Sequence, residues 1–168
     1  MSFIQLANER YSVRKYREVK IEEEKLEMIL DAARIAPTAH NSQPQRIKVL
    51  TSDEELSIVD ECTPCRFGSP LVFLICYDKD VSWKRVFDKA DSGEVDASIV
   101  TTHMMFAAQE LKLNSCWVMF FDPIKTRKLF SLPVNLEPVA FLVVGYAADD
   151  AVPSDSHSKR NTIDEMLI

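Results

Sequence analysis

Two arginines on either side of a serine near the start of the chain could bind a phosphate group. Arg10 and Arg14 flank Ser12 at positions i−2 and i+2. A guanidinium group can bind phosphate oxygens through two parallel hydrogen bonds, and a serine hydroxyl adds a further donor. The alternative is a solvated basic turn, because Lys15 and Arg17 follow in the same segment and exposed charges commonly have no partner.

A second polar segment, residues 36–44, lies between two prolines after an apolar helical run. Loops on rigid supports commonly carry binding groups. Asn41 and Gln43 carry amides that both donate and accept hydrogen bonds, which suits the edge of a heteroaromatic ring. Alternatively, the segment is a connector whose amides cap the preceding helix.

Two further segments could contribute to a ligand site. Trp117, within residues 115–119, could stack on a planar ligand, although core packing is the usual role of tryptophan and methionine. Lys159 and Arg160 lie in the polar tail. They supply positive charge for an anion, or they belong to a solvated tail.

The remaining reactive side chains indicate neither metal nor nucleophile chemistry. Cys62 and Cys65 have the spacing of a redox dithiol, but a redox pair needs a helix start after a strand. Here the pair follows a predicted helix and precedes a predicted strand, which favours a structural role. The cysteine and histidine spacings do not fit a zinc site. His103 lies on an apolar helix and is predicted to be a buried or interface histidine. We therefore assign no catalytic side chain and no metal ligand.

Alternating helical and strand patterns supply the framework for these segments. Helices are recognised by apolar residues at positions i, i+3, i+4 and i+7, and buried strands by short continuous apolar runs. Such an alternation is typical of an α/β or α+β protein. Helices are predicted over residues 22–36, 53–60, 92–113 and 122–130, and strands over 47–50, 71–77, 115–121 and 139–145.

The predicted helix 92–113 is apolar around much of its circumference, so we expect it to lie centrally or against a partner subunit. Asp91, Glu94 and Asp96 gather at its start. Carboxylates are stabilised at the positive end of a helix dipole, which explains these three residues without catalysis.

Composition excludes several classes of protein. The 168 residues suffice for one well-cored domain, and a net charge of −6 gives no general attraction to nucleic acid or anionic membranes. Only three glycines occur, too few for a glycine-rich phosphate cradle. Four cysteines form no disulfide framework, the apolar runs are too short to span a bilayer, and no signal peptide is recognisable. These features predict a soluble cytoplasmic protein.

Taken in order, the segments resemble the nitroreductase family of FMN-dependent oxidoreductases over essentially the whole chain. Arg10-x-Ser12-x-Arg14-x-Tyr16 is similar to the N-terminal phosphate-binding motif of that family. Residues 36–44 resemble its APSxxNxQPW signature. Three later segments also match in order: the long helix followed by residues 116–118, the strand 139–146, and the basic pair 159–160.

The resemblance implies an α+β fold: a three-layer sandwich in which a central mixed sheet is flanked by helices, in a single domain over residues 1–168. It also implies an intertwined homodimer. Residues 99–108 would form the apolar stripe at the subunit interface, and a C-terminal arm, about 147–168, would embrace the partner. Two FMN molecules would lie at the interface, each contacted by both subunits.

The same resemblance implies a set of cofactor-binding residues. The N-terminal motif would hold the FMN phosphate and ribityl chain, and Lys159 or Arg160 would complete the phosphate site. The signature segment would approach that flavin from the other subunit, and the backbone after the long helix would line the isoalloxazine ring. By position these residues are Arg10, Ser12, Arg14, Lys159 and Arg160, then Pro37, Thr38 and Asn41, then Trp117, Val118 and Met119.

The implied activity is transfer of a hydride from NADH or NADPH through flavin N5 to a flat acceptor, nitroaromatic or quinone-like, by a ping-pong mechanism. The flavin would carry the chemistry and the protein would tune it. Arg14 would place positive charge near the N1/O2 edge, where reduced flavin gains negative charge. Two alternatives stay open: a protein of this fold that stores or modifies flavin without NAD(P)H turnover, and an interaction protein that binds no flavin.

The sequence departs from the family pattern at several positions, and two of them bear on the pocket. Gln45 replaces the tryptophan that follows the signature proline, and Met119 stands where many members have glycine or another residue beside the flavin. A side chain at position 119 would narrow the pocket or change the choice of acceptor.

Overall fold

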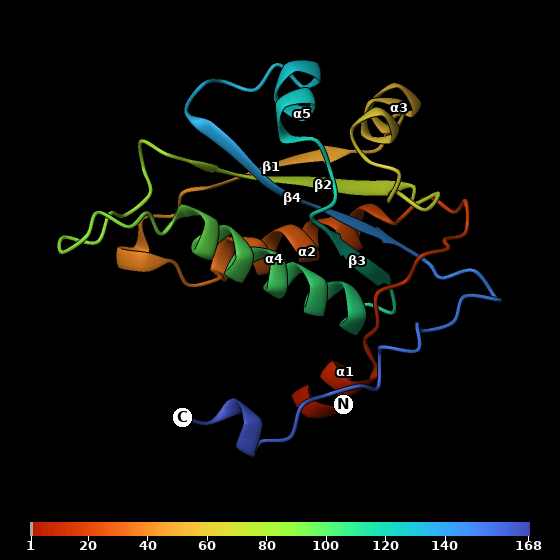
Figure 1. Ribbon diagram of the computed structural model, residues 1–168. Helices are drawn as coiled ribbons and strands as arrows, with labels where there is room; N and C mark the ends of the chain where they lie inside the picture. Colours follow the sequence, from red (N-terminus) through yellow and green to blue (C-terminus); the bar gives the residue numbers. More distant parts are fainter. Residues whose placement is uncertain (1) are drawn as a thin grey trace.

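The computed structural model describes residues 2–168, which form helices on both faces of a sheet (Figure 1). Each predicted helix and strand is present, with ends that differ from the expected ones by a few residues. The helices are α1 (Phe3–Glu9), α2 (Glu23–Ile35), α3 (Asp53–Cys62), α4 (Gly93–Glu110) and α5 (Pro123–Leu129). The strands are β1 (Gln45–Leu50), β2 (Leu71–Asp78), β3 (Asn114–Val118) and β4 (Leu136–Gly145).

Within the described residues the four strands form one sheet in the order β1-β2-β4-β3, and each neighbouring pair is antiparallel. The expectation of a mixed sheet is therefore wrong for the strands of this chain. The antiparallel arrangement follows from the connections between the strands. The last residue of β1, Leu50, pairs with Val72 near the start of β2, so α3 and the loop after it return the chain to the end of the sheet that it left. In addition, β2 and β3 run parallel to each other, but β4 lies between them.

The molecule has three layers, as expected. Helices α2 and α4 cover one face of the sheet, and α3 and α5 cover the other (Figure 1). Alternate residues of each strand face opposite sides, so Phe73 and Leu142 belong to the α2/α4 core, whereas Leu74 and Phe141 belong to the α3/α5 core. These four side chains have no exposed surface. The α+β prediction is confirmed.

Local sequence signals explain where several helices begin. The Ser52 hydroxyl accepts a hydrogen bond from the backbone N–H of Glu55, whose side chain bonds back in a capping box. Asp122 accepts from the N–H groups of Ile124 and Lys125, and Pro123 occupies the first helical position. The cap predicted at the start of α5 is confirmed.

Helix α4 lies centrally, as its apolar circumference predicts. Val100, Met104 and Ala108 are fully buried in the α2/α4 core. Val95, on another side of the helix, is 60% exposed. His103 is half-buried, and its Nδ1 lies 2.9 Å from the carbonyl oxygen of Ile99 one turn earlier.

The C-terminal segment leaves the sheet after β4 and contains a turn over residues 155–158 and one short 3-10 helix, Asp164–Met166 (Figure 1). Several of its apolar side chains lie on the surface, including Ile163 and Leu167. Among residues 2–168, no helix has the length and apolarity needed to cross a membrane. All four cysteines are free thiols.

Candidate functional site

A basic pocket of about 180 Å³ forms where the N-terminal segment meets the C-terminal tail. Three guanidinium groups and several hydroxyl groups line it, and the lining residues described include no carboxylate. This donor set is suited to a phosphate or another oxyanion. The lining residues are Arg10, Tyr11, Ser12, Arg14, Ser154, Ser156, His157 and Arg160.

The N-terminal segment is fixed to the edge of the sheet. Ser12 forms an isolated parallel bridge with Ser115 of β3, and the Val13 N–H donates to the Ser115 carbonyl oxygen over 3.2 Å. Val13 is fully buried in the α3/α5 core. Because side chains alternate along extended backbone, burial of Val13 directs Ser12 and Arg14 away from the core and toward the pocket.

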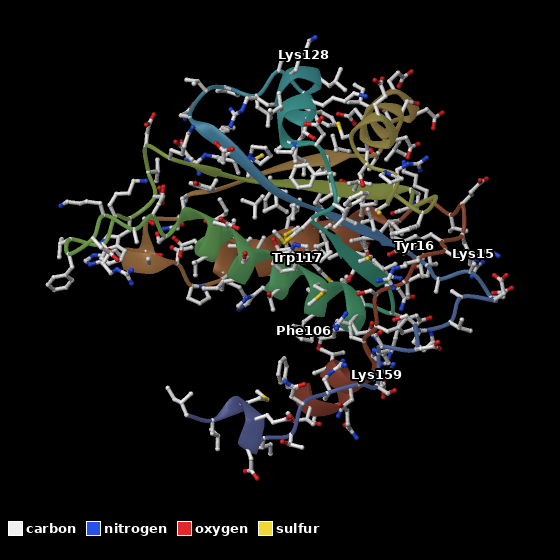
Figure 2. The ribbon with its side chains drawn as sticks, in the orientation of Figure 1. Lys15, Tyr16, Phe106, Trp117, Lys128 and Lys159 are labelled. Carbon is white, nitrogen blue, oxygen red and sulfur yellow. The ribbon has the colours of Figure 1, made fainter. Side chains whose placement is uncertain are left out.

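The C-terminal tail is held over this segment by contacts of Tyr11. The Tyr11 hydroxyl donates to the carbonyl oxygen of Ala151 over 3.3 Å. Its ring meets that of His157 edge to face, with centroids 5.9 Å apart. These contacts bring Arg160 into the pocket, whereas Lys159, labelled in Figure 2, is exposed and does not line it.

The electrostatics of the pocket favour an anion. Arg10 is half-buried, and its pKa is lowered first by burial and then by the nearby charge of Arg160. Both effects make the charged form of Arg10 less stable than it would be in water. A bound phosphate would offset the repulsion between the two guanidinium groups.

The signature segment, residues 36–44, lies at the amino end of α4. The Ala39 N–H donates to the carboxylate of Asp96 over 2.8 Å. His40 stacks on Trp83 with ring centroids 5.5 Å apart. Pro37 and Asn41 are exposed and Thr38 is half-buried, so the segment presents polar groups at the surface.

One chain does not bring the signature segment and the basic pocket together. The segment contacts the amino end of α4, whereas the pocket is tied to Ser115, beyond its carboxyl end. Figure 1 shows the two regions at opposite ends of the helix. An 18-residue helix is ~27 Å long at a rise of ~1.5 Å per residue. Within one chain the signature segment and the basic pocket are therefore far apart.

The residues at the end of β3 have three different environments. Trp117 is half-buried against the α2/α4 core (Figure 2), and its indole N–H is buried without a protein partner. Val118 is 4% exposed in the opposite α3/α5 core. Met119 follows the strand and is 62% exposed. Of the three side chains, only that of Met119 is largely open to a ligand, and Trp117 has the packing role that is usual for tryptophan.

The two cysteines with redox-like spacing have different exposures. Cys62 is buried at the end of α3, and Cys65 is half-buried. Burial raises the pKa of the Cys62 thiol, the opposite of the shift that activates a redox thiol. This environment supports the structural role predicted for the pair.

Sequence reasoning missed several lining residues of the pocket. Ser154, Ser156 and His157 belong to a polar tail that carries no periodic signal. Tyr11 belongs to the basic motif, but its contact with the tail joins distant parts of the chain, which no local pattern indicates. The position of Asp96 in the first turn of α4 predicts a role toward the helix dipole, and the structure shows that it also accepts a hydrogen bond from the signature segment.

The chain belongs to the nitroreductase family, whose model matches residues 7–65 and 66–146. A nitroreductase family protein of known structure from Clostridium difficile 630 is 44% identical, with a TM-score of 0.94 over 100% of this chain and 98% of that chain. An FMN-dependent nitroreductase from Clostridium difficile R20291 is 26% identical, with a TM-score of 0.77 over 95% and 98% of the two chains.

A relative known from its sequence gives the same family. The protein from Methanothermobacter thermautotrophicus, provisionally named an NADH dehydrogenase/NAD(P)H nitroreductase, is 28% identical over 160 residues. The alignment covers 89% of this chain and 80% of that protein.

Proposed function

We propose that this protein is an FMN-dependent oxidoreductase that uses NADH or NADPH. The basic pocket carries the proposal, because three guanidinium groups and neighbouring hydroxyls match the charge and hydrogen-bonding capacity of the FMN phosphate. The family membership and the FMN dependence stated for the 26% identical relative support this choice of ligand.

Each part of the proposed site has its own role. Arg10, Ser12, Arg14 and Arg160 would hold the phosphate and ribityl chain, with Lys159 nearby in the exposed tail. The backbone at residues 117–119 would line the ring. Arg14 is exposed and its Nη1 donates to the Ser12 carbonyl oxygen, so its remaining donors are free for the ligand.

The proposal includes a homodimer, because one chain separates the signature segment from the basic pocket. In the dimer, Pro37, Thr38 and Asn41 of one subunit would complete the site built on residues 10–14 and 160 of the other. The exposed apolar residues of the tail, such as Ile163 and Leu167, would be covered by the partner. Residues 147–168 are thus proposed as an arm extending from a single domain.

FMN, when bound, supplies hydride transfer from the nicotinamide to a flat acceptor, nitroaromatic or quinone-like, in two half-reactions. The chain positions the cofactor and places positive charge around it, and the proposal assigns no side chain to proton transfer. Met119 would border the acceptor site, because it is exposed at the end of β3. The four free thiols favour a reducing compartment, the cytoplasm.

The visible spectrum of the protein tests the proposal. We expect flavin absorbance to persist after reconstitution with FMN and desalting, and to bleach when NADH or NADPH is added without oxygen. Retained flavin that neither nucleotide bleaches would favour the storage or modification of flavin instead. Protein that retains no flavin would contradict the proposal and leave a nitroreductase fold with another role.

A further inference from the structure

A buried carboxylate joins the amino end of α4 to the signature segment. Asp96 is 1% exposed. One of its oxygens accepts a hydrogen bond from the Ala39 N–H over 2.8 Å, and the other accepts from the Ser92 hydroxyl over 2.7 Å. Burying a charge is costly unless it is hydrogen-bonded, so these two donors offset the free-energy cost of burying the Asp96 carboxylate.

The helix dipole alone does not account for this arrangement. Glu94, in the same first turn, is exposed and provides the same favourable charge without the cost of burial. Ser92 is the N-cap residue of α4, yet its side chain makes no cap hydrogen bond. Its hydroxyl instead orients the Asp96 carboxylate. The Ser92 hydroxyl, which could have capped the helix, therefore holds in place the carboxylate that binds the loop.

The loop that Asp96 holds has an unfavourable backbone conformation. His40, Asn41 and Gln43 have φ angles of 53°, 54° and 50°, in the left-handed region that L-residues other than glycine seldom adopt. Inside the loop, the Gln43 N–H donates to the Thr38 hydroxyl over 3.0 Å. Such strain persists only where the surroundings fix the conformation, and it is frequent at functional sites.

We propose that Asp96 is a positioning residue for the flavin site: it holds residues 38–43 in the conformation that contacts the cofactor of the partner subunit. This inference rests on the proposed function, because it takes the loop to be a flavin-binding segment. Asp96 itself is buried beneath the loop and acts through Ala39.

The stacking of His40 on Trp83 provides a measurement of loop position that needs no flavin. Their rings lie 5.5 Å apart with an interplanar angle of 16°, so Trp83 emission reports whether the loop keeps its place. The chain has only two tryptophans, and a Trp117→Phe background leaves Trp83 as the single emitter.

The experiment compares Asp96→Ala, Asp96→Asn and Glu94→Ala. Asparagine can accept from Ala39 and donate to Ser92, so it tests rescue by a similar side chain. Glu94→Ala removes a carboxylate from the same helical turn without touching the loop. Trp83 emission is measured in the flavin-free Trp117→Phe chains, and FMN affinity is measured by fluorescence titration with Trp117 present.

We expect Asp96→Ala to change Trp83 emission and to raise the Kd for FMN about tenfold, the effect of one lost buried hydrogen bond. Asp96→Asn and Glu94→Ala should resemble the unmodified chain in both measurements. If Asp96→Ala does not fold, Ser92→Ala removes one donor to the carboxylate and should cause a smaller change in the same direction.

Unchanged Trp83 emission in Asp96→Ala, or in Ser92→Ala where that variant replaces it, would show that the carboxylate does not hold the loop. Changed emission with unchanged FMN affinity would overturn the positioning role. Failure of the unmodified chain to bind FMN would instead contradict the proposed function, and Trp83 emission would still report on the contact between Asp96 and the loop.

Discussion

Arg10 and Arg160 come from opposite ends of the chain and line the same pocket. Burial and the charge of Arg160 together lower the pKa of Arg10, so the protein holds two like charges close together before any ligand binds. The contacts of Tyr11 with Ala151 and His157 keep the tail in place despite this repulsion. A site preorganised in this way favours an anion because the ligand relieves the repulsion.

Replacement of Arg10 by alanine should weaken FMN binding strongly. Loss of hydrogen bonds to a charged group costs on the order of 1.5–3 kcal/mol, or about a tenfold to hundredfold increase in Kd. Arg10→Lys should retain part of the affinity, since lysine keeps the charge but lacks the planar fork. Fluorescence titration with FMN measures both. Arg17→Ala, an exposed arginine that does not line the pocket, is the control and should bind normally.

A charged residue at position 107 should disrupt the proposed dimer and flavin binding together. Ala107 lies on α4 within the stripe expected at the subunit interface, and it lines a shallow hollow with Phe3 and Phe106. The Phe106 side chain is labelled in Figure 2, and it meets the ring of Phe3 edge to face at 5.0 Å. Ala107→Glu would place a charge in the proposed interface, and burial of a charge without a partner is strongly unfavourable.

Analytical ultracentrifugation and flavin absorbance measured on the same sample check this prediction. We expect Ala107→Glu to be monomeric and poor in flavin. Ser57→Glu, at an exposed position on α3, should stay dimeric and loaded. A flavin-loaded dimer in Ala107→Glu would show that the interface lies elsewhere on the molecule.

Element positions could be predicted from sequence because they depend on local periodicity and caps. The start of α5 follows from Asp122 and Pro123 alone, and the long apolar stripe identifies α4 as a central helix. Strand direction could not be predicted, because it depends on where the loop after α3 leads the chain. Leu50 and Val72 become neighbours only through that return.

The site was predictable only in part, for a similar physical reason. Arg10, Ser12 and Arg14 form one short motif, and the structure places them in one pocket. Arg160 lines the same pocket and Lys159 does not. The path of the tail determines which of the two side chains reaches the pocket, and the sequence Lys-Arg alone does not indicate it. Asp96 binds Ala39 across 57 positions, and no pattern within α4 indicates that contact.

Alkaline pH should destabilise the fold through Cys76. Burial raises the pKa of its thiol to about 12 from an ordinary value of 9.0. Between these values the unfolded chain loses the proton while the folded chain keeps it. The unfolded state then binds fewer protons, so the free energy of unfolding falls as pH rises. The stabilisation is fully present below pH 9 and is lost progressively above it.

Urea unfolding at pH 8 and pH 10.5 measures this contribution. Cys76→Ala should be less stable than the unmodified chain at pH 8, because a buried side chain is truncated. At pH 10.5 the difference should narrow by about 1–2 kcal/mol. Val72→Ala truncates another fully buried residue of β2 that has no ionisable group, so its difference should stay constant. Equal behaviour of the two variants would contradict the assignment to Cys76.

The ring of Tyr77 of β2 lies against the backbone of Gly93 at the start of α4. A Cβ added there would meet the Tyr77 ring at 2.0 Å from Cδ2 and 2.2 Å from Cε2. These atoms belong to a half-buried ring, so the ring or the helix must move. Gly93→Ala should therefore destabilise the fold by about 1–3 kcal/mol, the usual cost of overpacking, although alanine favours helices over glycine.

A double-mutant cycle with Tyr77→Leu distinguishes the steric clash with the Tyr77 ring from an effect of alanine on the backbone conformation of residue 93. In the Tyr77→Leu background the ring is absent, and we expect Gly93→Ala to be neutral or slightly stabilising in urea unfolding. The same loss of stability in both backgrounds would show that Gly93 is needed for its backbone conformation. Because Gly93 lies three residues before Asp96, the unfolding measurement should be accompanied by FMN titration. A variant that stays folded but binds FMN poorly would indicate that the start of α4 also fixes the position of the signature segment.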